Sequence, residues 1–231
     1  MIGGRGIPPA AREGRRGLLY VLLDLAGPPD GLPRLLTALR GAWHAIDLLQ
    51  VRAKDLPAED HVAALREVRS AVAADLPSGR GPLLLANDRL DVSLAAGADG
   101  VHVGAEDLPP QALRTLAGLP EAFIVGLTCH DRAEVHSAVG RGADYLALGP
   151  FFPSSTKPEA VGDPWSALES LPLDFPLPVY AIGGITADNA ARLPAHPALR
   201  GIVVSAAVQH AADPRAAVAE LRGILSARPR A

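Results

Sequence analysis

Eight short apolar segments recur along the chain, and longer segments with helical spacing separate them. The apolar segments are nearly continuous rather than alternating, which is typical of parallel strands covered on both faces. The predicted strands are residues 18–23, 45–51, 82–86, 100–103, 123–127, 145–148, 178–182 and 201–204. The predicted helices are residues 58–74, 90–96, 110–117, 132–140, 165–171, 187–193 and 214–225.

This alternation predicts a single α/β domain, a (β/α)8 TIM barrel over residues 18–231, slightly below the usual size. Residues 1–17 are rich in Gly, Arg, Ala and Pro and are expected to form a disordered arm. An open doubly wound sheet is the alternative, but it is expected to place a glycine-rich phosphate loop after its first strand. Residues 24–29 read Asp-Leu-Ala-Gly-Pro-Pro and lack that spacing.

Composition limits the expected binding partners and the expected cellular location. With 22 basic and 25 acidic side chains, the net charge of -3 argues against nucleic-acid binding but leaves room for a local anion site. The apolar run 18–23 is too short for a signal peptide, and no run approaches a membrane span. Cys129 is the only cysteine, so a reducing cytoplasm is the simplest location. The oligomeric state stays open, with a homo-oligomer as one possibility.

Polar residues end the second predicted strand, where a barrel places its chemistry. Alternation in an extended chain puts Gln50, Arg52 and Lys54 on one face. Two cations and an amide donor on one side predict a site for an anion with several charges. The alternative is a solvated strand end, which has no reason to align three such donors.

Carboxylates follow the third and fourth predicted strands, which would be neighbours. Asp88 follows Asn87 after one strand, and Asp107 follows the other. Two carboxylates beside a polyanion site suggest Mg2+, which is held by few protein oxygens together with phosphates and water. Each Asp taken alone has another reading, because Asn-Asp before a helix is also good N-cap chemistry.

The fifth strand is followed by three residues of different character. Thr128 could hydrogen-bond a ligand, and His130 could be an acid, a base or a polar lid residue. Cys129 has no nearby residue spaced as an activating base, so a small buried thiol is the better interpretation.

Two further loops complete the predicted mouth of the barrel. The loop after the sixth strand carries Ser154, Ser155, Thr156 and Lys157 after two adjacent phenylalanines, and it could close over a ligand or be an ordinary surface loop. After the last two strands, Gly183-Gly184 and Ser205 predict a backbone-built phosphate site. Two anion sites in one mouth would suit the joining of a diphosphate ester to a monophosphate ester.

From about residue 18 to its end, the chain resembles the thiamine-phosphate synthase family (thiamine-phosphate pyrophosphorylase). Several motifs occur in the order expected of that family, which is far more specific than any one of them. They are Gln50-Val51-Arg52-Ala53-Lys54, Asn87-Asp88, Gly100-Val101-His102-Val103-Gly104 with Asp107, Gly126-Leu127-Thr128-Cys129-His130, Gly149-Pro150 with residues 153–157, Ala181-Ile182-Gly183-Gly184-Ile185, and Val203-Val204-Ser205-Ala206.

The resemblance implies a (β/α)8 transferase that couples 4-amino-2-methyl-5-hydroxymethylpyrimidine diphosphate to hydroxyethylthiazole phosphate. It implies a dissociative mechanism and a Mg2+ ion held by Asp88 and Asp107. By the same resemblance, Arg52, Lys54 and Lys157 would stabilise the departing diphosphate. The residues implied to bind the pyrimidine diphosphate are Gln50, Arg52, Lys54, Asn87, Thr128 and Lys157. Those implied to bind the thiazole phosphate are Ser154, Ser155, Thr156, Gly184, Val204 and Ser205.

The chain departs from the family pattern at a few positions. Ser154 stands where Thr is usual, Thr128 where Ser is usual, and Ala105 where Gln is common. The first strand lacks the familiar Val-Thr-Asp ending, and residues 158–162 look short for the family.

Two rival functions remain. The related thiazole tautomerase uses the same barrel and has a histidine like His130, but it generally lacks the full diphosphate-binding set. A non-catalytic protein that keeps a phosphate pocket would not need the two carboxylates, Asp88 and Asp107. Their presence, with Arg52, Lys54 and Lys157, favours the transferase.

Overall fold

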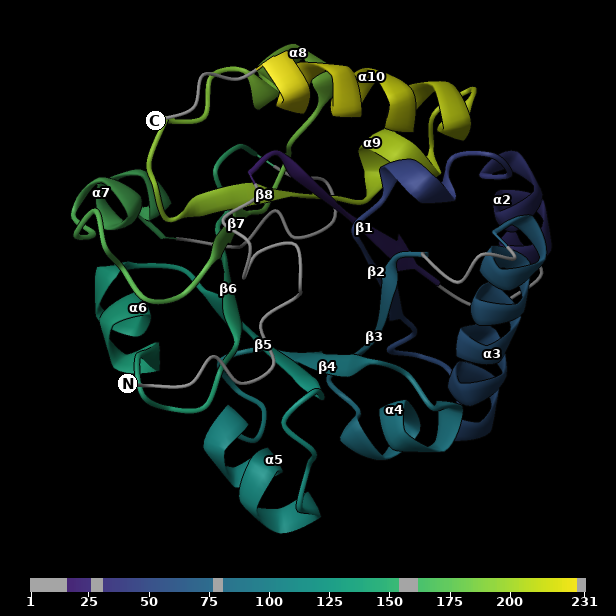
Figure 1. Ribbon diagram of the computed structural model, residues 1–231, viewed down its shortest axis with the longest axis horizontal. Coiled ribbons are helices and arrows are strands. Elements are labelled where there is room, and N and C mark those ends of the chain that lie inside the picture. Colours follow the sequence, from purple (N-terminus) through teal and green to yellow (C-terminus); the bar gives the residue numbers. More distant parts are fainter. Residues whose placement is uncertain (1–15, 26–30, 77–80, 154–161, 228–231) are drawn as a thin grey trace.

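Eight parallel strands close into a barrel in the computed structural model, which describes residues 16–25, 31–76, 81–153 and 162–227. Figure 1 shows the strands in the centre with the helices arranged around them. The strands follow one another around the barrel in chain order, and β1 pairs with β8 to close it. Their bounds are β1 Leu18–Asp24, β2 Leu48–Arg52, β3 Leu83–Asn87, β4 Gly100–Val103, β5 Ile124–Cys129, β6 Tyr145–Leu148, β7 Val179–Ala181 and β8 Leu199–Val204.

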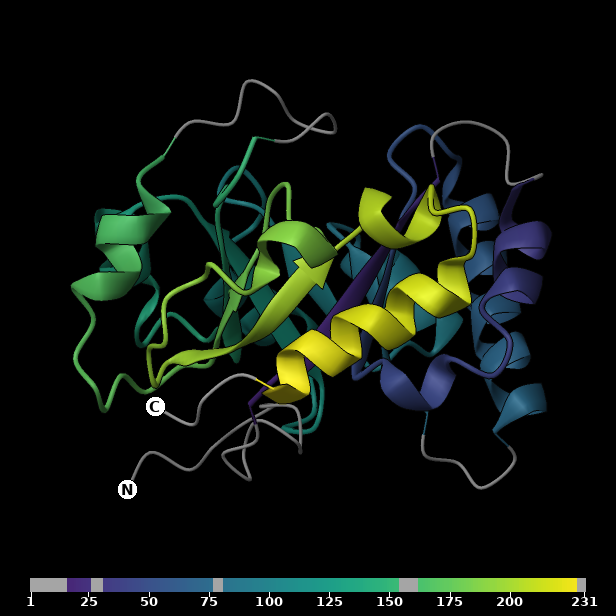
Figure 2. The same cartoon turned by 90° about the horizontal axis from the view of Figure 1, so that it is seen from above.

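The helices lie outside the strands, and α10 packs against β1 and the short helices α8 and α9 (Figure 2). The helical bounds are α2 Leu32–Ala38, the 3-10 turn η2 Trp43–Ala45, α3 Ala58–Asp75, α4 Leu90–Ala96, α5 Pro110–Ala117, α6 Arg132–Ala138, α7 Pro164–Glu169, α8 Ala187–Ala190, α9 Ala206–Gln209 and α10 Pro214–Ala227. None of the helices among the described residues has the length and apolarity needed to cross a membrane.

The predicted (β/α)8 barrel is confirmed, and most predicted boundaries agree within a few residues. The strands 100–103 and 145–148 and the helices 90–96 and 110–117 have the predicted limits. The second strand begins later than predicted because Ala45 belongs to the turn η2. Helices α2 and α9 have no counterpart among the predicted helices.

Local chemistry explains several helix ends. The Asp131 side chain accepts the backbone N–H of Glu134 and caps α6, while Thr186 and Asn189 form a capping box at α8. Gly97 and Gly118 end α4 and α5 in the left-handed conformation that glycine adopts without steric cost.

Two apolar layers hold the barrel together. The larger layer lies between the strands and the surrounding helices, where α3 contributes Leu65 and Val68. The smaller layer fills the barrel interior and centres on Tyr20, Tyr145 and Tyr180, whose rings meet edge-on at centroid distances of 5.3 to 6.1 Å. This packed floor closes the barrel below its carboxyl-terminal mouth.

Candidate active site

A pocket of about 310 Å3 lies above the tyrosine floor, at the carboxyl ends of the strands. This is the end at which barrels of this type carry their chemistry. The polar side chains that line it come from strands β1 to β5 and from the loops after β5, β7 and β8. They include Tyr20, Gln50, Arg52, Asn87, His102, Thr128, His130, Thr186 and Ser205.

Gln50 and Asn87 form the buried polar part of the pocket at β2 and β3. The Gln50 amide donates to Oδ1 of Asn87 at 2.7 Å, and its carbonyl oxygen accepts from the Tyr20 hydroxyl at 2.5 Å. Gln50 is only 1% exposed and Asn87 9%. Buried amides with satisfied hydrogen bonds hold one orientation, so this pair presents a fixed polar edge to the pocket.

Thr128, near the end of β5, belongs to the same network. Its hydroxyl lies 2.8 Å from His102 Nε2, and His102 Nδ1 lies 2.9 Å from the Tyr145 hydroxyl. Tyr145 in turn lies 3.1 Å from Tyr20, which connects Thr128 to Gln50 through the barrel interior. Gly126 makes room for this network, because a Cβ there would come within 2.4 Å of both Tyr145 and His102.

Sequence patterns alone give Tyr20, His102 and Tyr145 no site role. A histidine at the centre of an apolar strand, as in residues 100–103, was the available signal. It indicates a polar side chain that needs a buried partner.

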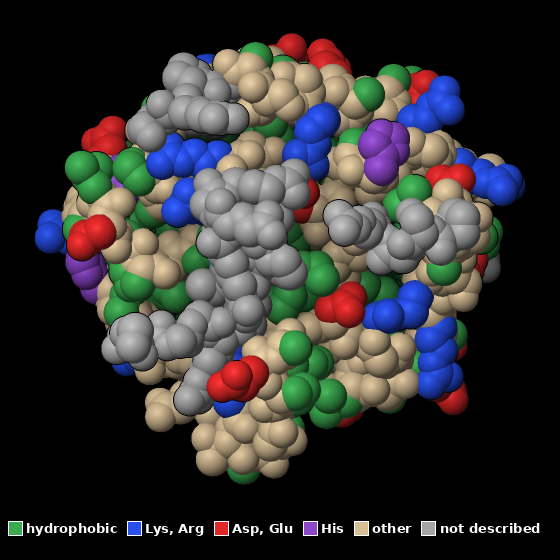
Figure 3. Space-filling model, viewed as in Figure 1, with side chains coloured by type: hydrophobic (Ala, Val, Ile, Leu, Met, Phe, Trp, Pro, Cys, Tyr) green, Lys and Arg blue, Asp and Glu red, His purple; other side chains and the backbone are tan. Residues whose placement is uncertain are grey.

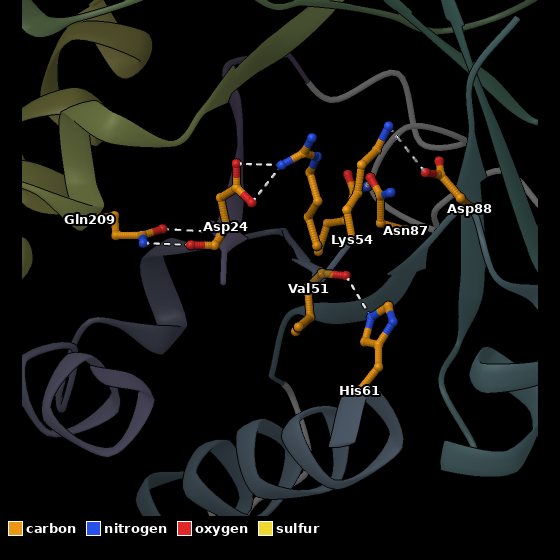
Figure 4. Close-up of polar contacts among 9 residues, drawn as sticks. Asp24, Val51, Lys54, His61, Asn87, Asp88 and Gln209 are labelled. Carbon is orange, nitrogen blue, oxygen red and sulfur yellow. Dashed lines mark hydrogen bonds and ion pairs between the residues drawn. The ribbon is translucent and has the colours of Figure 1, made fainter. Parts of the chain in front are cut away.

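Arg52 projects into the pocket from the end of β2 and is held by Asp24 at the end of β1. Arg52 Nη1 donates to both carboxylate oxygens of Asp24, each at 2.7 Å. The two side chains are 21% and 17% exposed. The backbone of Asp24 is itself bound by the Gln209 carboxamide, which Figure 4 shows facing it.

Lys54 and Asp88 meet just beyond the carboxyl ends of β2 and β3, which carry the pocket-lining residues Arg52 and Asn87. Lys54 Nζ lies 3.9 Å from Asp88 Oδ2 (Figure 4). Asp88 has a φ of 59°, a left-handed conformation that Asp tolerates better than most residues. Its backbone N–H donates to the His102 carbonyl, and residue 89 rather than Asp88 occupies the N-cap position of α4. The N-cap alternative for Asp88 therefore does not apply.

Asp107 lies close enough to Asp88 for the two carboxylates to interact. Burial, followed by the charge and hydrogen bonding of Asp107, raises the pKa of Asp88 above its usual range. Asp107 Oδ2 also accepts the backbone N–H of Gly104 at 2.7 Å, which fixes that carboxylate. The structure thus brings together the two carboxylates that the sequence nominated for a metal.

The opposite side of the pocket is formed by backbone groups rather than by charged side chains. Gly183 and Gly184 both have positive φ values, and a Cβ on Gly184 would meet the carbonyl oxygen of Pro153 at 2.2 Å. The backbone N–H of Phe152 donates to the Gly183 carbonyl and holds the two loops together. Gly184, Val204 and Ser205 all line the pocket, and Ser205 directly precedes α9.

The remaining residues singled out from the sequence are the loop residues 154–157, His130 and Cys129. Ser154, Ser155, Thr156 and Lys157 lie outside the described residues. His130 lines the pocket, and its Nδ1 lies 3.0 Å from Glu134 Oε2. Cys129 is fully buried, and burial followed by the charges of Glu134 and Asp131 raises its pKa to about 12, which agrees with the interpretation of a buried thiol.

The fold and the pocket define a (β/α)8 barrel with Arg52 and nearby carboxylates on one side of its mouth and a glycine-built side opposite. The sequence profile of the thiamine monophosphate synthase family matches residues 27–208, and the chain belongs to this family. The resemblance inferred from the motifs is therefore confirmed.

Named relatives support the same family. A thiamine-phosphate synthase of Anaeromyxobacter dehalogenans is 39% identical over 219 residues, covering 94% of this chain and 92% of the relative. A thiamine biosynthesis bifunctional protein of Symbiobacterium thermophilum is 40% identical over 216 residues, and the match spans 93% of this chain but 41% of that longer protein. The solved structure of a thiamine phosphate pyrophosphorylase from Pyrococcus furiosus superimposes with a TM-score of 0.72 at 31% identity, covering 93% of this chain and 98% of the other.

Proposed function

We propose that this protein is a Mg2+-dependent thiamine-phosphate synthase. It joins the pyrimidine methylene of 4-amino-2-methyl-5-hydroxymethylpyrimidine diphosphate to the nitrogen of hydroxyethylthiazole phosphate, and diphosphate leaves. The observation that carries the proposal is the pairing of two unlike ends in one pocket. Arg52 lines one end of the pocket, and Lys54, Asp88 and Asp107 gather beside that end after β2, β3 and β4. Gly184 and Ser205 line the other end.

The charges at the first end support a divalent cation. Arg52 and Lys54 contribute two positive charges, while Asp24, Asp88 and Asp107 contribute three negative charges, so these five residues sum to about -1 when all are ionised. A diphosphate would be repelled by that balance without added positive charge. Among the described residues no cluster of three or more His, Cys, Asp or Glu gathers for a metal.

Two converging carboxylates nevertheless fit Mg2+, which commonly takes one or two protein carboxylates and completes its shell with phosphate and water. Asp88 and Asp107 would hold the ion. When bound there, it would neutralise charge on the departing diphosphate. Lys157, which lies outside the described residues, would add a further positive charge by resemblance to the family.

The chain's residues then have the following roles in the proposed reaction. Arg52 and Lys54 bind the diphosphate and stabilise the charge that develops as the carbon–oxygen bond breaks. Gln50, Asn87 and Thr128 orient the pyrimidine diphosphate, and their buried or partly buried hydrogen bonds keep them in place. Gly184, Val204 and Ser205 bind the phosphate of the thiazole, whose nitrogen supplies the electron pair for the new carbon–nitrogen bond. No protein nucleophile is required, and the protonated thiol of Cys129 is not poised to act as one.

The test is incubation of the purified protein with both substrates and Mg2+, with thiamine phosphate measured by chromatography. Formation of thiamine phosphate and diphosphate in equal amounts, lost on chelation of the metal, supports the proposal. The pocket position of His130 and its Glu134 partner make thiazole tautomerisation the alternative to assay in parallel. Tautomerase turnover without thiamine phosphate would overturn the assignment, and binding of thiazole phosphate without either reaction would identify a non-catalytic relative.

A further inference from the structure

The barrel seam between β1 and β8 opens before β1 ends. The ladder between these strands pairs Leu18–Val21 with residues 201–204, whereas the ladder to β2 continues as far as Asp24 and Arg52. The last residues of β1 therefore extend beyond the end of β8. This open part of the seam lies between the Arg52 side of the pocket and the Ser205 side.

The Gln209 side chain acts as the missing strand partner for Asp24. Its Oε1 accepts the backbone N–H of Asp24 at 2.9 Å, and its Nε2 donates to the backbone carbonyl of Asp24 at 2.7 Å. A side-chain amide can satisfy both backbone groups of one extended residue in the way a neighbouring strand would. Gln209 is the last residue of α9, the helix that begins directly after Ser205.

Asp24, held in this way, in turn restrains the Arg52 side chain. Its carboxylate accepts two charge-assisted hydrogen bonds from Arg52 Nη1, which are stronger than neutral ones. Arg52 and Ser205 both line the pocket, whereas Asp24 and Gln209 do not. A chain of direct contacts, from Arg52 through Asp24 and Gln209 to α9, therefore runs behind the pocket from one anion-binding end to the other.

We propose that Asp24 and Gln209 are positioning residues that align the two anion-binding ends of the pocket. They fix the Arg52 guanidinium relative to the beginning of α9, so that the two bound substrates keep one separation and orientation. This inference rests on the proposed function only in taking those ends as the diphosphate and monophosphate sites. A displacement of about 1 Å between reacting groups can reduce a rate by on the order of 10²-fold, so such alignment has a measurable consequence.

The kinetic test uses Gln209→Met, which keeps the side-chain length and removes both hydrogen bonds. We expect kcat to fall about tenfold when the variant is assayed well below its melting temperature, which the loss of the two hydrogen bonds lowers. In the Asp24→Ala background, where the link to Arg52 is already broken, the same substitution should change kcat less than about twofold. Gln111→Met on the exposed face of α5 is the matched control and should leave kcat unchanged. Equal effects of Gln209→Met in the two backgrounds would overturn the proposal.

A second measurement does not depend on turnover. Nitrogen-15 NMR of the Arg52 guanidinium, assigned by its absence in Arg52→Lys, reports rotation about the Nε–Cζ bond. We expect separate Nη1 and Nη2 signals in the wild-type protein and averaged signals in both Asp24→Ala and Gln209→Met. An unchanged spectrum in Gln209→Met would overturn the link even in an active enzyme. Absence of thiamine phosphate from the wild type, with the spectral changes present, would refute the proposed function alone.

Discussion

Arg52 donates from a single nitrogen, Nη1, to both carboxylate oxygens of Asp24, at 2.7 Å each. This geometry leaves Nε and Nη2 of the same guanidinium outside the ion pair. Because Arg52 also lines the pocket, one planar group can be anchored on one edge and bind an anion on the other.

The first prediction follows from the two contacts of the Arg52 guanidinium, one with Asp24 and one with a bound anion. Arg52→Lys keeps the positive charge but cannot span the carboxylate and a diphosphate with a planar group. We expect kcat/KM for the pyrimidine diphosphate to fall on the order of 10²-fold. Arg89→Lys, which changes an exposed arginine paired with Asp91, is the control and should leave steady-state kinetics unchanged. A near-native rate in Arg52→Lys would show that a point charge is enough at this position.

The second prediction is that removing the charge of Asp88 lowers activity but raises the stability of the metal-free protein. Asp88→Asn tolerates the left-handed backbone and removes a charge that burial and Asp107 disfavour in the folded protein. We expect the variant to lose Mg2+-dependent turnover on the order of 10²-fold, yet to melt at a higher temperature than the wild type when no divalent cation is present.

The sign of the stability change follows from the raised pKa of Asp88. The folded state binds the Asp88 proton more tightly than the unfolded state, so stability falls as the pH rises through the usual Asp range to the raised value. At neutral pH the ionised group therefore destabilises the metal-free protein. Thermal denaturation with and without Mg2+ checks this, and Asp91→Asn is the exposed control. A lower melting temperature for metal-free Asp88→Asn would contradict the account.

Periodicity predicted the barrel because each strand and most helices carry their own apolar pattern. It could not predict α9, whose four residues are too few to show a helical period and are held by contacts such as the one from Gln209 to Asp24. Those two residues are 185 positions apart, so no local spacing relates them. The sequence can predict that Gln50 and Arg52 share a face because a single strand aligns them, and that Asp88 and Asp107 lie close together because neighbouring strands end at the same edge.

The third prediction concerns the thiol. Cys129 is fully buried with its pKa raised to about 12, so it stays protonated at neutral pH and no reagent can reach it without opening of the barrel. We expect iodoacetamide to label the native protein no faster than the protein unfolds. We also expect Cys129→Ala to retain turnover at a stability cost of about 1 kcal/mol. Labelling kinetics in native and urea-unfolded protein check this. Loss of turnover in a folded Cys129→Ala variant would require a chemical role for the thiol.

The last prediction separates two tyrosines of the barrel floor by their hydrogen bonds. The Tyr180 hydroxyl is buried with no hydrogen-bond partner among the described residues, whereas the Tyr145 hydroxyl contacts both Tyr20 and His102. Removing an unsatisfied buried hydroxyl relieves a desolvation cost, but removing a shared one leaves two groups unpaired. We expect Tyr180→Phe to be neutral or to stabilise the protein by up to about 1 kcal/mol, and Tyr145→Phe to destabilise it by about 2 kcal/mol. Urea denaturation measures both, and because the rings pack in the same cluster each variant is the other's control. Destabilisation of similar size in the two variants would mean that Tyr180 has a hydrogen-bond partner in solution, such as a buried water.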